Sequence, residues 1–172
     1  MASNGPASSP ASRWGTAATG TTRARCSCCR DPQRARSDFR IGFEGSDRCY
    51  DLGVRAVRAD GGEVDQGGGP MWRVQDADND YVCRFNPLES NFRVYVVQDG
   101  VRRQLGTTLV ITKPGEFHRV EVAFVGDRIT CSLNGALLLD VRDATIGKAG
   151  GVGLWTKADA RTSFDDFVVT AR

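Results

Sequence analysis

The stretch that decides the fold is DQGGGPMWRVQDADNDYVCRFNPLESNFRVYVV, which runs from Asp65 to Val97. It contains three runs in which apolar and polar residues alternate, Met71–Val74, Tyr81–Asn86 and Phe92–Val97, separated by the polar turns QDADND and PLES. A period of two is typical of a strand with one buried face. The second face carries Arg, Asn and Tyr, side chains that bind polar ligands, so the stretch predicts a binding face as well as a sheet.

Working outward, the rest of the chain shows the same pattern at hairpin spacing. Asp99-Gly100 and Asn134-Gly135 are two-residue turn signals, because both pairs tolerate the positive φ of tight hairpins. Asp143–Ile146 is the only stretch that predicts a helical turn. Many short strands predict an antiparallel sandwich or barrel, and we expect an all-β, two-sheet jelly-roll sandwich with one concave face. The further predicted strands are Tyr50–Ala59, Val101–Leu105, Leu109–Thr112, His118–Val125, Arg128–Leu133, Leu137–Val141, Val152–Thr156 and Phe164–Thr170.

Composition divides the 172 residues into a tail and one domain. Residues 1–38 are rich in Ala, Ser, Thr and Arg, carry a net charge of +4 and have Trp14 as their only large apolar side chain, so we expect a disordered tail. Residues 39–172 carry a net charge of −2 and form the predicted sandwich domain. That balance excludes nucleic acid as the expected partner. No apolar stretch is long enough for a membrane span, and the N-terminus as given has no signal-peptide pattern.

The cysteines and the single histidine do not predict nucleophilic catalysis. Cys83 and Cys131 alternate with core residues and are expected to be small buried apolar side chains. His118 heads a predicted strand with no cysteine near it in sequence, so a Cys–His pair is not expected. The CSCC cluster at 26–29 lacks a second pair at zinc-finger spacing and predicts no metal site.

Three segments carry a resemblance to a known superfamily: DQGGGPMWRVQDADNDYVCRFNPLESNFRVY, GEFHRVEVAFVGDRITCSLNGALLLDV and GGVGLWTKADARTSFDDFVV. Over residues 48–170 the chain resembles the concanavalin A-like lectin/glucanase superfamily, and within it bacterial 3-keto-disaccharide hydrolase-like and family 16 glycosidase-like domains. The resemblance implies a jelly roll that handles carbohydrate on its concave side, and export from the cell. Two residues depart from the pattern of these domains. Phe117 stands where they often have Trp, and Asp80 stands where a second aromatic residue before Tyr81 is typical.

The segments that resemble this superfamily do not contain a complete set of catalytic carboxylates. The family 16 strand Glu-x-Asp-x-x-Glu is matched by Glu63 and Asp65, but Gly68 replaces the third acid, and the Gly-rich context predicts a solvated loop. Glycoside cleavage normally needs a proton donor and a second carboxylate. Glu89 is a further candidate, with a salt bridge to Arg84 or Arg93 as the alternative interpretation. The adjacent Asp165 and Asp166 are others, with backbone hydrogen bonding or an ion pair as the alternative. No catalytic residue is predicted.

Asp76, Asp78 and Asp80 form a D-x-D-x-D run like that of calcium loops. An EF-hand loop would place Gly and Glu where the chain has Tyr81 and Pro87, so the run predicts an Asx turn. No cofactor is predicted, although the resemblance leaves a structural calcium ion open.

The predicted ligand-binding face combines hydrogen-bonding side chains with an aromatic ring, which suits the hydroxyls and the apolar face of a sugar. The alternative is that Trp72 and Trp155 belong to the core and the arginines to a solvated outer face. Three functions remain open: a carbohydrate-binding or accessory module, which we favour, a 3-keto-disaccharide hydrolase-type enzyme, and a structural or adhesion sandwich. The predicted site residues are Arg73, Arg84, Asn86, Glu89, Asn91, Tyr95, Trp155 and Lys157.

Overall fold

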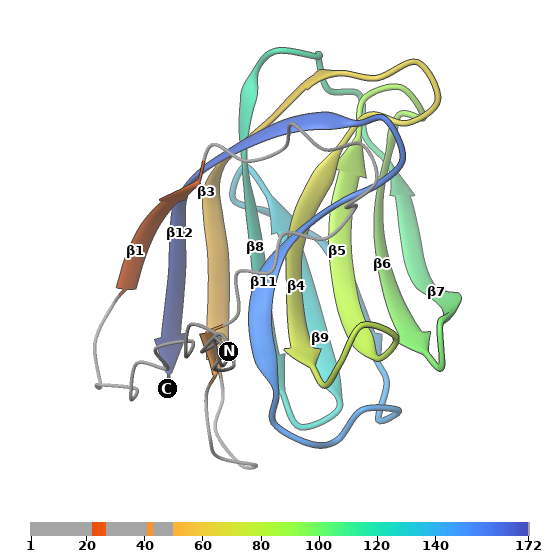
Figure 1. Ribbon diagram of the computed structural model, residues 1–172, viewed down its shortest axis with the longest axis vertical. Helices are drawn as coiled ribbons and strands as arrows, with labels where there is room; N and C mark the ends of the chain where they lie inside the picture. Colours follow the sequence, from red (N-terminus) through yellow and green to blue (C-terminus); the bar gives the residue numbers. More distant parts are fainter. Residues whose placement is uncertain (1–21, 27–40, 43–49, 172) are drawn as a thin grey trace, which may run out of the picture.

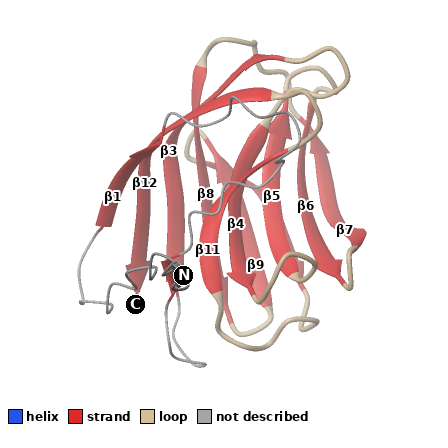
Figure 2. Cartoon of the chain, viewed as in Figure 1, coloured by secondary structure: helices blue, strands red, loops and turns tan. Residues whose placement is uncertain are grey.

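The computed structural model describes residues 22–26, 41–42 and 50–171, and its described elements are all strands, joined by turns and loops (Figures 1 and 2). None of the described residues forms a helix that could cross a membrane. The strands are β1 (Thr22–Cys26), β2 (Ile41–Gly42), β3 (Tyr50–Gly61), β4 (Gly68–Val74), β5 (Asp80–Asn86), β6 (Asn91–Gln98), β7 (Val101–Leu109), β8 (Phe117–Val125), β9 (Arg128–Leu133), β10 (Ala136–Arg142), β11 (Gly151–Thr156) and β12 (Arg161–Ala171).

The strands form two antiparallel sheets packed face to face (Figure 1). The back sheet has the order β1-β12-β3-β8-β9-β10, and the front sheet has the order β2-β11-β4-β5-β6-β7. The long connections that carry the chain between sheets make this a jelly-roll sandwich, as the alternating runs predicted. The front face is defined here as the side of the front sheet that points away from the back sheet.

The core between the sheets consists of the alternate residues that the sequence pattern assigned to it. Tyr81, Cys83 and Phe85 of β5 point inward, as do the even-numbered residues from Phe92 to Val96 of β6. Trp72 of β4 is fully buried, and its ring stacks on Tyr81 with the ring centroids 5.5 Å apart. Burial of these large apolar surfaces supplies most of the favourable free energy of folding.

Both two-residue hairpin turns are confirmed. Asn134 and Gly135 have φ of 51° and 84°, and Asp99 and Gly100 have φ of 51° and 76°. Positive φ at both central positions is the geometry of a type I′ turn, whose twist matches that of the strands on either side. The Asn134 side chain helps to hold the Asn134-Gly135 turn, because it accepts a 2.9 Å hydrogen bond from the backbone N–H of Arg119.

Other predictions differ from the structure. The run expected at 101–105 extends to Leu109 as β7, whose pairing with β6 shifts register between Val94 and Tyr95, and the separate strand expected at 109–112 does not form, because residues 110–112 lie outside any strand. Asp143–Ile146 is an irregular loop instead of a helical turn, because the Asp143 carboxylate accepts from the backbone N–H of Thr145 at 2.9 Å. The predicted disordered tail lies outside the described residues except for β1, which pairs with β12.

Candidate functional site

The front face carries the polar set that the alternation predicted on β5 and β6. Val82, Arg84 and Asn86 of β5 point away from the core, and Arg93 and Tyr95 of β6 lie beside them in the paired register. Because side chains of a strand alternate between faces, the buried partners at 81, 83 and 85 fix this orientation. Two neighbouring strands therefore present arginine, amide and phenol groups on one surface.

Arg73 does not belong to this surface, which corrects the prediction. It has a positive φ of 49°, and the β4–β11 pairing shifts register between Gly151 and Gly153. Such a bulge breaks the alternation, so Trp72 and Arg73 both turn away from the front face. The Arg73 guanidinium donates to the carbonyl oxygens of Ile146 at 2.8 Å and Gly126 at 2.7 Å. Its role is to hold two loops at the end of the sandwich.

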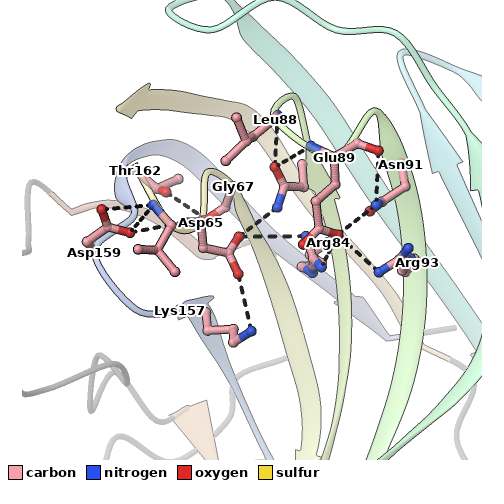
Figure 3. A network of polar contacts seen from close by, with 12 residues as sticks. Asp65, Gly67, Arg84, Leu88, Glu89, Asn91, Arg93, Lys157, Asp159 and Thr162 are labelled. Carbon is pink, nitrogen blue, oxygen red and sulfur yellow. Dashed lines mark hydrogen bonds and ion pairs between the residues drawn. The ribbon is translucent and has the colours of Figure 1, made fainter. Parts of the chain in front are cut away.

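Glu89 collects three hydrogen bonds on one carboxylate oxygen (Figure 3). Oε2 accepts from Asn91 at 2.8 Å, from Arg93 at 3.0 Å and from Arg84 at 3.1 Å. The bond from Asn91 and the bonds and charges of the two arginines hold the pKa of Glu89 below its usual value. The salt-bridge interpretation of Glu89 is therefore confirmed for both arginines.

Asn86 places Glu89 by shaping the turn between β5 and β6. Its side-chain oxygen accepts from the backbone N–H of Leu88 at 2.9 Å and of Glu89 at 3.2 Å. Its amide nitrogen donates to Asp65 at 2.6 Å. Asn86 is fully buried and its hydrogen-bonding groups are engaged, so it supports the site without being available to a ligand.

Asp65 forms the second carboxylate centre, which the sequence pattern missed. It is buried, its Oδ1 accepts from Asn86, and its Oδ2 lies 3.4 Å from Lys157 Nζ (Figure 3). The solvated-loop prediction is wrong for Asp65 and correct for Glu63, which is exposed. Asp159 holds this loop, because its carboxylate accepts the backbone N–H groups of residues 63–65. No spacing in the sequence links residues 65 and 159.

Arg84 lies between the two carboxylate centres. Its side chain is only 2% exposed, with Nη2 3.1 Å from Glu89 Oε2 and Nη1 3.9 Å from Asp65 Oδ1. Its guanidinium also lies 5.9 Å from the centroid of the Tyr95 ring. A buried arginine is tolerated only when opposite charge surrounds it, so Arg84 ties the Glu89 turn to the Asp65 loop.

Aromatic rings and one unpredicted arginine, Arg102, complete the front face. Trp155 is 7% exposed and packs with Met71, Val74 and Val82 in a second apolar cluster. Arg102 of β7 lies 4.8 Å from the Tyr95 ring centroid and 5.9 Å from that of Trp155. Strands β7 and β11 are four spacings apart in the sheet, about 19 Å if it were flat. The meeting of their side chains is what a concave face produces.

The position of Arg102 on the front face could have been predicted from the Asp99-Gly100 hairpin turn. Because Asp99-Gly100 is a two-residue turn, Gln98 pairs with Val101 and Val97 pairs with Arg102. Val97 shares a face with Tyr95, so Arg102 must lie on that face too. Trp155 meets the prediction that it lies on this face, yet its burial leaves little of the ring for stacking on a sugar.

The other candidates are engaged in local structure. Asp76 accepts the backbone N–H of Asp78 at 2.7 Å, which confirms the Asx turn in the D-x-D-x-D run. Within the described part of the chain, no group of three or more His, Cys, Asp or Glu side chains lies close enough to hold a metal ion. Asp165 accepts the backbone N–H of Asp166 at 2.9 Å, as the alternative interpretation of that pair expected.

Cys83, Cys131 and His118 have buried side chains. Cys83 and Cys131 are fully buried free thiols, and burial raises the pKa of Cys83 well above its ordinary value. His118 is buried, with Nδ1 3.1 Å from the Asn134 side-chain nitrogen. A thiol with a raised pKa is a poor nucleophile, so Cys83 is not suited to nucleophilic catalysis.

Comparison with solved structures supports the architecture. Carbohydrate-binding module CBM66 from Bacillus subtilis superposes with a TM-score of 0.62 at 20% identity, over 73% of this chain and 76% of that one. The galectin LEC-6 of Caenorhabditis elegans gives 0.58 at 11% identity, over 80% and 93%. The chain has the concanavalin A-like jelly-roll fold. A xylan β-1,4-xylosidase from Bacillus halodurans gives 0.57 at 8% identity, and there the match covers 76% of this chain but 29% of the enzyme.

The sequence comparisons do not assign the chain to a family. No protein-family model matches the chain, and no curated protein is significantly similar to it. Identities of 20% and below support the shared fold alone, so the function must be argued from the residues of the front face.

Proposed function

We propose that the protein is a non-catalytic carbohydrate-binding module and that the front face binds the sugar. The proposal is supported by the polar groups gathered there, which come from β5, β6, β7 and the end of β11. Carbohydrate sites combine planar donors and carboxylate acceptors around hydroxyls with nearby aromatic surface. The front face has the donors and the carboxylate acceptors, with the largely buried rings of Tyr95 and Trp155 beside them, and the structural neighbours named as a carbohydrate-binding module and a galectin are consistent with it.

The observation that carries the proposal is the arrangement around Glu89. Its Oε2 is saturated by three donors, whereas no donor among the described residues reaches Oε1. The side chain is 37% exposed, so Oε1 is accessible to a hydroxyl group of a ligand. Arg93 lies beside it with an exposed fraction of 31%, and Lys157, 43% exposed, lies at the Asp65 end of the network; both supply donors for hydroxyl groups. A fixed acceptor beside an exposed cationic donor can hydrogen-bond to adjacent hydroxyl groups of a sugar.

Binding is favoured over hydrolysis by the protonation state of Glu89. A general acid in glycoside cleavage must carry a proton at working pH, which requires a raised pKa. The surrounding donors lower the pKa of Glu89 instead. Glu89 is therefore suited to accept hydrogen bonds as a carboxylate and unsuited to donate a proton to a leaving group.

The test is a glycan array with the full chain, followed by isothermal titration calorimetry on the hits. Arg93→Ala and Lys157→Ala should each weaken binding about ten- to a hundredfold, the usual effect of losing one charged donor. Arg128→Ala is the matched control, because Arg128 is an exposed arginine of the back sheet that pairs with Asp140. The proposal fails if no glycan binds, or if both front-face variants bind like the control.

A further inference from the structure

Arg102 differs from most arginines around it in having no carboxylate partner among the described residues. Its neighbour Arg103 pairs with Asp143 at 2.6 Å, and Arg128 of the back sheet pairs with Asp140 at 2.6 Å. The guanidinium of Arg102 instead contacts the rings of Tyr95 and Trp155. An exposed guanidinium that lies against two rings keeps its hydrogen-bond donors available.

The charge balance of the front face is also unequal. Four cationic side chains lie on it against three carboxylates: Arg84, Arg93, Arg102 and Lys157 against Asp65, Asp80 and Glu89. Asp65 and Glu89 are paired with Arg84, Arg93 and Lys157, so Arg102 is the front-face cation that has no carboxylate partner among the described residues.

We infer that the front face selects acidic saccharides and that Arg102 binds the carboxylate of a uronic acid residue. The planar guanidinium matches the planar carboxylate with two parallel hydrogen bonds, which a neutral sugar cannot provide. The rings of Tyr95 and Trp155 hold the guanidinium in place, so little side-chain freedom is lost when the ligand binds. This inference rests on the proposed function, because it names the class of sugar bound at the same site.

The first experiment separates ligand charge from ligand shape. The full chain is titrated by calorimetry with a panel of uronate oligosaccharides, with their methyl esters, and with neutral and sulfated oligosaccharides of the same length. We expect at least tenfold tighter binding of a free uronate than of its methyl ester, and a dissociation constant that rises with sodium chloride concentration.

The second experiment assigns the effect to Arg102. Arg102→Ala should abolish the preference for the free acid over the ester, and Arg102→Lys should restore part of it, because lysine keeps the charge without the fork. Arg119→Ala is the control: Arg119 is exposed on the outer side of β8 in the back sheet, and its loss removes the same charge. Thermal unfolding of each variant verifies that the fold is retained.

The outcomes distinguish this inference from the function on which it rests. Tight binding of a neutral sugar with no binding of uronates would overturn the acidic ligand and leave the carbohydrate-binding module intact. Preference for sulfated over uronate sugars, or an unchanged preference in Arg102→Ala, would overturn the assignment of Arg102 to a carboxylate. Failure to bind any member of the panel or of the glycan array would overturn both.

Discussion

Replacing Glu89 with Ala should destabilise the fold, because Glu89 holds a buried cation as well as a turn. Two of its three donors belong to buried side chains, Arg84 and Asn91. Hydrogen bonds to charged groups contribute about 1.5–3 kcal/mol each, and the exposed pair with Arg93 adds about 0–1 kcal/mol. Because the bonds share one oxygen they are not additive, so we expect Glu89→Ala to lower the free energy of unfolding by about 2–4 kcal/mol.

The assay is urea denaturation at neutral pH with Glu63→Ala as the matched control. Glu63 is exposed in the adjoining loop, and its substitution removes the same charge and the same side-chain length. We expect the control to change the free energy of unfolding by less than about 0.5 kcal/mol. If Glu89→Ala and Glu63→Ala have the same midpoint, the carboxylate does not stabilise Arg84, and the description of the network is wrong.

Three further predictions concern parts of the fold outside the network. Burial would raise the pKa of Asp143, but hydrogen bonds led by that of Tyr81 lower it from 3.8 to about 2; about 2 kcal/mol of stability should be present above pH 4 and lost as the pH falls from about 4 to about 2. Asp143→Asn, compared by urea unfolding at pH 6 and pH 2.5, should remove that difference, and an unchanged pH dependence would contradict it. Gly135→Val should lower stability by about 1 kcal/mol or more, because a β-branched residue resists a φ of 84° although nothing lies within 4 Å of its Cβ; an unchanged denaturation midpoint would count against backbone strain. Gly69→Ala should cost about 1–3 kcal/mol, since its Cβ would overlap a backbone oxygen of β5, whereas Gly147→Ala, with open space around it, should cost little; equal melting temperatures for the two variants would refute the close approach of β4 to β5.

The sequence predicted the parts of the site that depend on local periodicity. Alternation in β5 places Arg84 on the face opposite Cys83 and Phe85, and the Asp99-Gly100 turn fixes the register of β7 on β6. Both signals act over a few residues, so they can be found without knowledge of the tertiary structure. The jelly-roll architecture follows because such strands must bury one face against a second sheet.

The missed parts depend on backbone conformations and contacts that the pattern does not encode. Arg73 turns away from the front face because it adopts a positive φ, which is rare for a non-glycine residue, and neither residue next to it in the sequence, Trp72 or Val74, is a type that signals a bulge. Asp65 became buried because Asp159, which is 94 residues away in the chain, holds its loop. Contacts of that separation arise from the packing of the sheets and are not visible in a period of two.

The recurrence of arginine in the strands therefore has two causes, and they lead to different expectations about function. Arg84 is buried and forms ion pairs within the protein, because the turn that follows β5 places Glu89 3.1 Å from its Nη2 and the loop before β4 places Asp65 3.9 Å from its Nη1. Arg102 has no carboxylate partner among the described residues, and its guanidinium lies against the rings of Tyr95 and Trp155. Substituting the first should change stability and ligand binding together, whereas substituting the second should change ligand selection at constant stability. The difference between these two arginines is thus the sharpest means of separating the support of the front face from its recognition of a ligand.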